Sequence, residues 1–321
     1  MANYNSDVEA VNALASTYGQ LQNEISKAIV GQQEVVNAVL QSILCDGHSL
    51  LVGVPGLAKT LLIKTIADVL DLSFKRIQFT PDLMPGDITG SEILDENRQF
   101  RFIQGPLFAN IVLADEINRT PPKTQAALLE AMQERNVTYG GHVHVLDKPF
   151  FVLATQNPIE QEGTYPLPEA QLDRFMFCIT LDYLNFNDEM QMVKNTTSGN
   201  KVALKKIISA ADIMQFQQLI RRIPVSENVL QYAVSLAAKT RPSTSMATDK
   251  ANNYLSWGAG PRASQFLVLG AKCHAAVNGK FSPDIEDVKA VASNVLRHRI
   301  VRNYKAEAEN ISVEQIIESL I

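Results

Sequence analysis

Short apolar runs recur through the first half of the chain, and polar or turn-forming residues bound each of them. Five runs have the length of a buried strand, at residues 49–52, 74–79, 111–114, 150–154 and 175–179. Stretches with helical spacing, including 61–70 and 124–134, lie between the runs. Alternating buried strands and helices are typical of a parallel sheet that helices cover on both faces. The first half therefore predicts an α/β fold around a five-stranded parallel sheet.

Two further segments show the apolar and polar alternation of β-hairpins. One covers residues 91–103 around a turn at 95–98, and the other covers 137–145 around Gly140 and Gly141. Paired glycines supply the positive φ angles that tight hairpin turns need. We expect both hairpins as inserts in the α/β unit.

The pattern changes after about residue 183. A polar stretch at 186–200 is expected to be a linker between an α/β domain, 1–185, and a second domain, 201–321. Beyond it the periodicity is helical. Ser209 and Asp212 have capping-box spacing. Apolar residues recur at spacings of three and four residues over 225–239 and, behind Ser282, over 283–296. A loop rich in Ser, Thr, Asn and Gly, 241–260, interrupts the helices. The second half predicts a small all-α domain.

The charge balance of the chain bears on which kinds of partner it can attract. The chain has 321 residues with 29 Lys and Arg against 34 Asp and Glu, a net charge of -5. This balance gives no global attraction to nucleic acid or to an anionic membrane. Cys45, Cys178 and Cys273 have neither zinc-site nor disulfide-framework spacing, so we expect buried, reduced thiols.

No apolar run approaches the roughly 18 residues that span a bilayer. The polar start, residues 1–7, does not resemble a signal peptide. We expect a soluble, cytoplasmic protein without stable membrane insertion.

The strongest chemical signal is the segment GVPGLAKT at residues 53–60, between a predicted strand and a predicted helix. A phosphate needs inward backbone N–H groups, a helix N-terminus, a lysine for the outer oxygens and a hydroxyl for Mg²⁺. Lys59 and Thr60 supply the last two. Ala58 stands where the common P-loop pattern has glycine, and we expect it to keep a negative φ. The expected nucleotide contacts here are Gly53, Pro55, Gly56, Leu57, Ala58, Lys59, Thr60 and Leu61.

Two carboxylates, Asp115 and Glu116, follow the apolar run at 111–114. At the carboxyl edge of a parallel sheet, Asp115 can hold Mg²⁺ through water and Glu116 can polarise the attacking water. An acidic pair at a strand end is often merely solvated. We expect this strand to lie next to the P-loop strand, and the two segments together predict nucleotide hydrolysis.

The order of these motifs resembles an AAA+ ATPase, and specifically the MoxR family. The resemblance covers nearly the whole chain and rests on the strings at 29–32, 53–60, 79–83, 113–135, 154–158 and 162–175. It implies a P-loop NTPase core with a C-terminal helical lid, ATP as ligand, and nucleotide contacts from Val30 and Gly31. MoxR proteins commonly carry alanine before the P-loop lysine, as this chain does with Ala58 before Lys59.

The resemblance assigns three more site residues. Asn157 matches sensor 1, where a neutral polar side chain orients water or contacts the γ-phosphate; a turn cap is the alternative. Arg174 matches the arginine finger that AAA+ rings contribute to a neighbouring subunit's nucleotide, and a local ion pair with Asp173 is the alternative. Arg262 matches sensor 2, and Pro261 before it favours the first turn of a lid helix.

The hairpins match the helix-2 insert and the hairpin preceding sensor 1, which MoxR proteins share with magnesium-chelatase motors and MCM helicases. Arg119 either reaches a subunit interface or is solvated. His142 and His144 could suggest a metal site, but two histidines without a third ligand are more often polar positions.

The resemblance implies an ATP-driven chaperone: a homo-oligomeric ring, expected to be a hexamer, that remodels or matures partner proteins such as von Willebrand factor A domain proteins or metalloenzyme complexes. Alternatives are a nucleotide-gated scaffold, a metal-chelatase motor subunit and a nucleic-acid motor. Glu116 and Arg174 disfavour the scaffold. The MoxR-type strings make the chelatase less favoured. The second hairpin lacks Lys and Arg, which disfavours the nucleic-acid motor.

Overall fold

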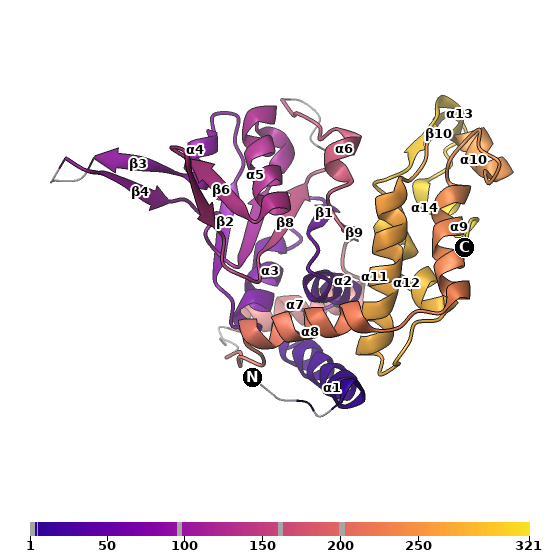
Figure 1. Cartoon of the computed structure of the whole chain (residues 1–321), viewed down its shortest axis with the longest axis horizontal. Helices are drawn as coiled ribbons and strands as arrows, with labels where there is room; N and C mark the ends of the chain where they lie inside the picture. Colours follow the sequence, from indigo (N-terminus) through magenta and orange to yellow (C-terminus); the bar gives the residue numbers. More distant parts are fainter. Residues whose placement is uncertain (1–3, 5, 95–97, 160–162, 199–202) are drawn as a thin grey trace.

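An α/β unit and a helical unit stand side by side in the computed structural model (Figure 1). It describes residues 4, 6–94, 98–159, 163–198 and 203–321. Helix α8 (Ala210–Arg222) runs beneath the α/β unit and leads to the helical unit.

The α/β unit is built on one parallel sheet with the strand order β2-β5-β8-β1-β9. Its strands are β1 (Ser49–Gly53), β2 (Phe74–Gln78), β5 (Ile111–Asp115), β8 (Phe151–Gln156) and β9 (Phe177–Leu181). The predicted five-stranded α/β fold is confirmed. The expectation that β5 neighbours β1 was wrong, because β8 pairs with both and lies between them.

Successive side chains of each strand enter two different cores. On β5, Ile111 and Leu113 pack with the helices of one face, and Val112 and Ala114 with those of the other. The first face is covered by α1 (Asp7–Ile25), α2 (Gln33–Leu44) and α3 (Lys59–Val69). The second is covered by α4 (Pro85–Thr89), η1 (Ile117–Arg119), α5 (Pro122–Glu134) and α6 (Glu169–Leu172). Burial on both faces explains why the strands are continuous apolar runs.

Both predicted hairpins are present. The first, β3 (Gly90–Leu94) with β4 (Phe100–Gln104), projects from the body (Figure 1), and residues 95–97 of its expected turn lie outside the described residues. The second, β6 (Asn136–Tyr139) with β7 (His142–Val145), turns at Gly140 and Gly141, whose φ angles are +57° and +81°. The His144 ring stacks on Phe102 with centroids 3.9 Å apart, so it joins the two hairpins.

The stretch expected to be a linker, 186–200, is helical over α7 (Phe186–Thr197). Asn185 is its N-cap, and the Asn185 side chain accepts the N–H of Asp188. The low hydrophobicity there reflects an exposed helix, since none of its residues is buried.

The helical unit holds α9 (Glu227–Lys239), α10 (Asp249–Tyr254), α11 (Pro261–Val277), α12 (Ile285–Leu296), α13 (Tyr304–Ala308) and α14 (Val313–Glu318). The predicted capping box of Ser209 and Asp212 starts α8, whereas α12 begins behind Asp284 and not Ser282. The expected loop 241–260 contains α10 and the strand β10 (Leu255–Trp257), which pairs with β11 (Val301–Arg302). A two-stranded ladder is thus added to the predicted all-α unit.

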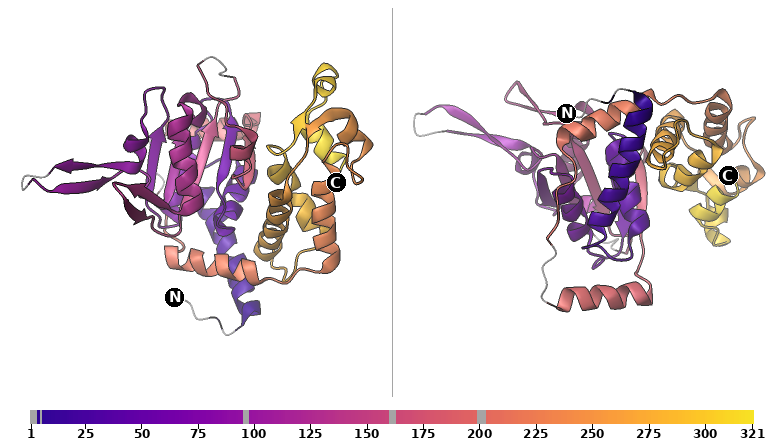
Figure 2. Two further views of the ribbon diagram at one scale, coloured as in Figure 1. Left: turned by 45° about the horizontal axis from the view of Figure 1, so that its top comes forward. Right: turned by 90° about the horizontal axis from the view of Figure 1, so that it is seen from below.

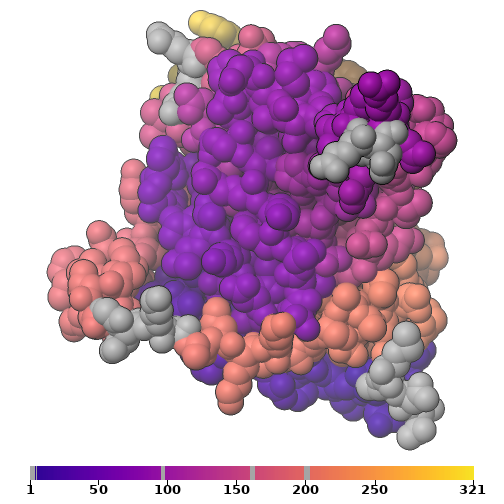
Figure 3. All heavy atoms as spheres, turned by 90° about the vertical axis from the view of Figure 1, so that its left-hand side faces the viewer, coloured from indigo at the N-terminus to yellow at the C-terminus, as the bar shows by residue number. Residues whose placement is uncertain are grey.

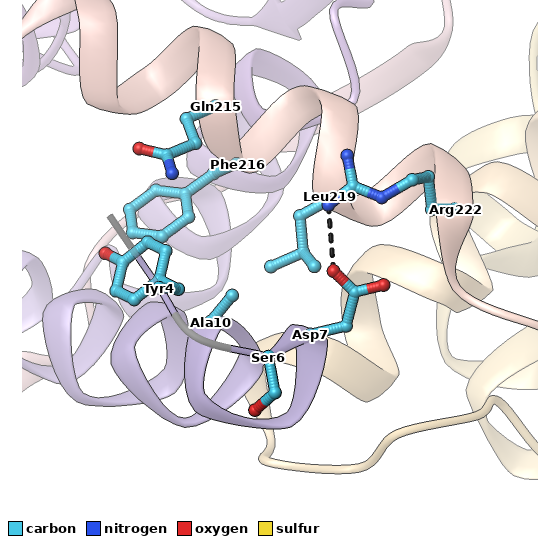
Figure 4. Close-up of a pocket in the computed structure, with 8 residues that line it drawn as sticks. All are labelled: Tyr4, Ser6, Asp7, Ala10, Gln215, Phe216, Leu219 and Arg222. Carbon is cyan, nitrogen blue, oxygen red and sulfur yellow. Dashed lines mark hydrogen bonds and ion pairs between the residues drawn. The ribbon is translucent and has the colours of Figure 1, made fainter. Parts of the chain in front are cut away.

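Helix α8 is fastened to the start of the chain. The rings of Tyr4 and Phe216 stack with centroids 6.4 Å apart, and Arg222 pairs with Asp7 at 2.9 Å (Figure 4). These residues line a cavity of about 240 Å³ between α1 and α8. One apolar core continues from α1 through α8 into α11 and α12, so α8 connects the two units.

The three cysteines are buried free thiols, as expected. Burial raises the pKa of the Cys178 thiol to about 12, which leaves it unreactive. Within the described residues, the structure contains no helix of the length and apolar character needed to cross a membrane.

Candidate nucleotide site

The loop between β1 and α3 contains two residues in the left-handed region. Gly56 has a φ of +88° and Ala58 has a φ of +52°, both in the left-handed region. The expected negative φ of Ala58 was therefore wrong. The left-handed conformation costs a side chain on the order of 1 kcal/mol, but it leads the chain directly into α3.

Lys59, the first residue of α3, reaches back over this loop, and its Nζ donates to the carbonyl of Gly53 at 2.5 Å. Burial lowers the pKa of Lys59, while Asp115 and Glu116 act in the opposite direction. A half-buried cation therefore lies at the loop, within electrostatic reach of both carboxylates. Thr60 follows on the first turn of the same helix.

Asp115 ends β5 and is held by two neighbours. Thr155 Oγ1 of β8 donates to Asp115 Oδ1 at 2.6 Å, and Arg76 of β2 pairs with Asp115 Oδ2 at 2.6 Å. Its neighbour Glu116 has a φ of +57° and donates its N–H to Thr155 Oγ1 at 2.9 Å. The flanking strands thus fix the direction of both carboxylates.

The Glu116 carboxylate has its own partners. Gln78 Nε2 donates to Glu116 Oε2 at 2.7 Å, and Arg119 pairs with the same oxygen at 2.9 Å. Arg119 therefore contacts a site residue of its own chain. The sequence analysis missed Arg76, Gln78 and Thr155. All three lie on the strands that flank β5, with Gln78 and Thr155 at or next to the strand ends, and this would have indicated them had the strand order been known.

A largely apolar cavity of about 340 Å³ adjoins the loop. Val30 lines it, and Gly31 lies beside it against Asp188: a Cβ at Gly31 would come within 2.6 Å of Asp188 Oδ2. The cavity is lined by Ala28, Ile29, Val30, Gln32, Pro55, Gly56, Leu57, Ala58, Leu61, Leu62, Tyr183, Leu184, Glu189, Met192 and Thr196. Its volume and apolar walls suit a nucleobase beside the phosphate loop.

Asn157 is buried directly after β8, the strand between β1 and β5. It therefore lies at the same sheet edge as the P-loop and Asp115. Its Oδ1 accepts the N–H of Ile159 at 3.2 Å. The side chain caps a turn in this structure, which is the alternative that the sequence left open.

Arg174 and Arg262 lie at the other edge of the sheet. Residue 177 begins β9 opposite Ser49, whereas Gly53 pairs with Leu181, so the P-loop and Arg174 lie at opposite ends of two adjacent strands and are separated by the length of one strand. That length is about 15 Å. Arg174 donates to the carbonyl of Leu129 at 3.1 Å, and no reach to its own P-loop is available from there.

The expected alternative for Arg174, an ion pair with Asp173, is not formed. Asp173 instead pairs with Arg262 at 3.1 Å and with Arg299 at 2.8 Å. Arg262 stands on the first turn of α11 behind Pro261, as predicted. Arg299, which the sequence analysis missed, is buried and also donates to the carbonyls of residues 173, 175 and 176. Asp173, the chain neighbour of Arg174, thereby brings Arg262 close to Arg174.

Comparisons with known proteins agree with this geometry. Residues 48–177 match the family model described as "ATPase family associated with various cellular activities (AAA)", and residues 248–320 match the AAA lid domain. Chaperone MoxR1 of Mycobacterium tuberculosis is 42% identical over 93% of this chain and 79% of its own length. The uncharacterized protein YeaC of Bacillus subtilis is 38% identical over 94% of this chain and 92% of its own length. A crystal structure assigned as an ATPase, from Cytophaga hutchinsonii, is 44% identical with a TM-score of 0.91, covering 97% of this chain and 95% of that one.

Proposed function

The chain belongs to the MoxR family of AAA+ ATPases, and we propose that it hydrolyses ATP as a ring whose sites are each completed by a neighbouring subunit. The observation that carries this proposal is the placement of Arg174 and Arg262 at the sheet edge opposite Lys59. Two arginines matched to catalytic roles cannot reach the phosphates bound by their own loop. A second copy can present them to that loop.

The residues of one subunit divide the remaining work. The nucleobase enters the cavity beside Val30, and the phosphates bind the loop N–H groups and Lys59. Glu116, held by Gln78 and Arg119, accepts a hydrogen bond from the attacking water and takes up its proton. Asn157 orients the same water. From the neighbour, Arg174 and Arg262 stabilise charge on the transferring phosphoryl group.

Mg²⁺ fits the same site. The Thr60 hydroxyl and the Asp115 carboxylate are hard oxygen ligands, which Mg²⁺ prefers when substrate phosphates and water complete its shell. Thr155 and Arg76 hold Asp115 at the loop's edge of the sheet. When bound, the ion neutralises charge on the phosphate oxygens.

The subunit arrangement is tested by mixing two inactive variants. Lys59→Ala and Arg174→Ala should each be nearly inactive alone. In mixed rings an Arg174→Ala subunit still binds ATP and receives the intact finger of a Lys59→Ala neighbour. Because an arginine finger contributes on the order of 10³-fold or more, even a minority of repaired sites gives measurable phosphate release. Native mass spectrometry confirms the mixed rings. Mixed rings without recovered turnover would mean either that Arg174 acts within its own subunit or that all sites of a ring must fire together, and titration of the wild type with each variant separates the two.

For the ring's task, we propose remodelling or maturation of a client protein, of the von Willebrand factor A domain or metalloenzyme kind. The name of the 42% identical relative, a chaperone, supports this over a chelatase motor or a scaffold. Affinity capture with Glu116→Gln and ATP tests it, because a trapped ATP state retains its client. Capture of nucleic acid instead, with binding that weakens steeply as salt rises, would contradict the chaperone proposal.

A further inference from the structure

Helix α7 presents an apolar side to solvent. It stands away from the sheet between two connecting segments and projects from the body (Figures 2 and 3). Phe186, Met190 and Val193, spaced by four and three residues, lie on one side of it and are 78%, 46% and 45% exposed. None of the residues of α7 is buried.

A short helix of this kind is stabilised mainly by packing against other parts of a protein. Isolated helices of about 12 residues are marginal in water, and in proteins an apolar side normally packs against something. One side of α7 has support, since Glu189, Met192 and Thr196 line the nucleobase cavity. The apolar side of Phe186, Met190 and Val193 has no cover within the described residues.

We propose that this apolar side of α7 is a docking surface for a second copy of this chain. The inference rests on the proposed function, in which a neighbour presents Arg174 and Arg262 to the phosphate loop. Helix α7 lines the same cavity as that loop, at the same edge of the sheet. A neighbour that brings its arginines to the phosphates is therefore brought next to α7 as well.

The neighbour carries a surface of matching chemistry near those arginines. Trp257, the only tryptophan of the chain, is 66% exposed on β10, five residues before Arg262. Exposed tryptophan and arginine are enriched in protein interfaces, and Met and Phe are frequent partners. We assign Trp257 as the side chain that packs against Met190 and Val193 of the adjoining subunit.

Charge agrees with this pairing. The first turn of α7 carries Asp188 and Glu189. Around Trp257, Arg241 donates to the backbone carbonyl of Ala259 and Arg302 to that of Ile311. Because these carbonyls carry no formal charge, these hydrogen bonds do not neutralise the positive charge of the two arginines. The positive edge beside Trp257 is thus complementary to the acidic start of α7.

The test uses the full chain with Met190→Gln and Val193→Gln combined. Both positions are exposed in the subunit, so the fold and the affinity for a fluorescent ATP analogue should be unchanged. The protein concentration needed for assembly, measured by sedimentation with ATP and Mg²⁺, should rise about tenfold or more because two apolar contacts are lost. The matched control is Gln191→Ala with Asn195→Ala, whose side chains hydrogen-bond to each other at 2.8 Å on a polar side of α7, and which should assemble like the wild type.

Trp257 reports directly on the contact. In the wild type its emission should shift to shorter wavelength on assembly, and the shift should be absent for the Met190→Gln, Val193→Gln protein at the same concentration. Unaltered assembly of that protein overturns the inference. An unchanged Trp257 emission in assembled wild type overturns it too. Normal assembly with lost capture of a client would identify the client, and not a second copy, as the occupant.

The two proposals fail in different experiments. Recovery of turnover by mixing Lys59→Ala with Arg174→Ala depends on neighbouring subunits but not on Met190 or Val193. Recovery together with unaltered assembly of the α7 variant rejects the docking surface alone. Absence of recovery in confirmed mixed rings, together with a wild-type titration that shows independently acting sites, rejects the proposed function.

Discussion

The hydroxyl of Thr155 donates to the carboxylate of Asp115 over 2.6 Å, from β8 to the adjacent β5. The hydroxyl oxygen of Thr155 also accepts the backbone N–H of Glu116 at 2.9 Å. One threonine therefore orients both Asp115, the proposed Mg²⁺ ligand, and Glu116, the proposed base. The contact exists because β8 is inserted between β5 and β1.

Replacing Thr155 tests its positioning role. Thr155→Val removes the hydroxyl while keeping the shape, so kcat should fall about tenfold, the magnitude of one hydrogen bond to a charged group. The KM for ATP should change little, because the loop and Lys59 are intact. Steady-state phosphate release measures both. Thr155→Ser keeps the hydroxyl and should stay near the wild type; an equal loss in both variants would indicate a packing effect.

Lys59→Ala and Glu116→Gln should separate binding from turnover. Lys59→Ala deletes the cation held at the Gly53 carbonyl, so binding of fluorescent ATP should be lost. Glu116→Gln keeps the shape and the contacts from Gln78, so binding should persist while hydrolysis falls by about 10² or more. Full turnover by the Glu116→Gln protein would show that another carboxylate is the base.

The sequence was sufficient for the parts of the site that are local. The phosphate loop, the acidic pair and both hairpins depend on neighbouring residues, and short-range spacing predicts them. The place of β8 between β5 and β1 was not predictable, because pairing of parallel strands is decided by helix packing far along the chain. For the same reason Arg76 and Thr155 were missed.

Two other differences have local causes that spacing does not show. Ala58 takes a left-handed φ because the loop must turn into α3, and a propensity rule cannot weigh that demand against a modest strain. Helix α7 was missed because it buries nothing, so the apolar periodicity of a buried helix is weak there. Its short stripe of Phe186, Met190 and Val193 is visible once the helix is known.

Stability should depend on pH through buried histidine. Burial, with a smaller effect of Arg135, lowers the pKa of His48 from 6.5 to about 3. His48 Nδ1 accepts the N–H of Val152, and Nε2 contacts the carbonyl of Met132, so the folded state holds the neutral ring. Between pH 6.5 and about 3 the unfolded chain binds a proton that the folded chain does not. The free energy of unfolding should therefore decrease as the pH is lowered through this range, by about 1.4 kcal/mol per pH unit for this group.

Urea unfolding between pH 7 and 5 measures this slope. His48→Gln retains a donor and an acceptor but does not titrate, so the slope should become shallower. His142→Gln, at an exposed hairpin position, serves as the control and should leave the slope unchanged. Equal slopes in the wild type and the His48→Gln protein would contradict the assignment to His48.

Two substitutions around Asp173 should separate stability from turnover. The Arg299 side chain is 1% exposed and donates to Asp173 Oδ1, whereas Arg262 is 42% exposed and pairs with Oδ2. Burial lowers the pKa of Arg299 to about 10, and Asp173 opposes that shift. Asp173→Asn leaves a buried cation without its counter-charge, so the free energy of unfolding should fall by about 3 kcal/mol.

Arg262→Ala should behave in the opposite way. An exposed ion pair contributes at most about 1 kcal/mol, so urea unfolding should hardly change. Nucleotide binding by the isolated subunit should persist, because Arg262 lies at the sheet edge away from Lys59. Turnover by the assembled protein should fall by about 10² or more if Arg262 completes the neighbour's site. Loss of ATP binding by the dilute, unassembled Arg262→Ala protein would contradict this, since it would require Arg262 to act on its own subunit's nucleotide.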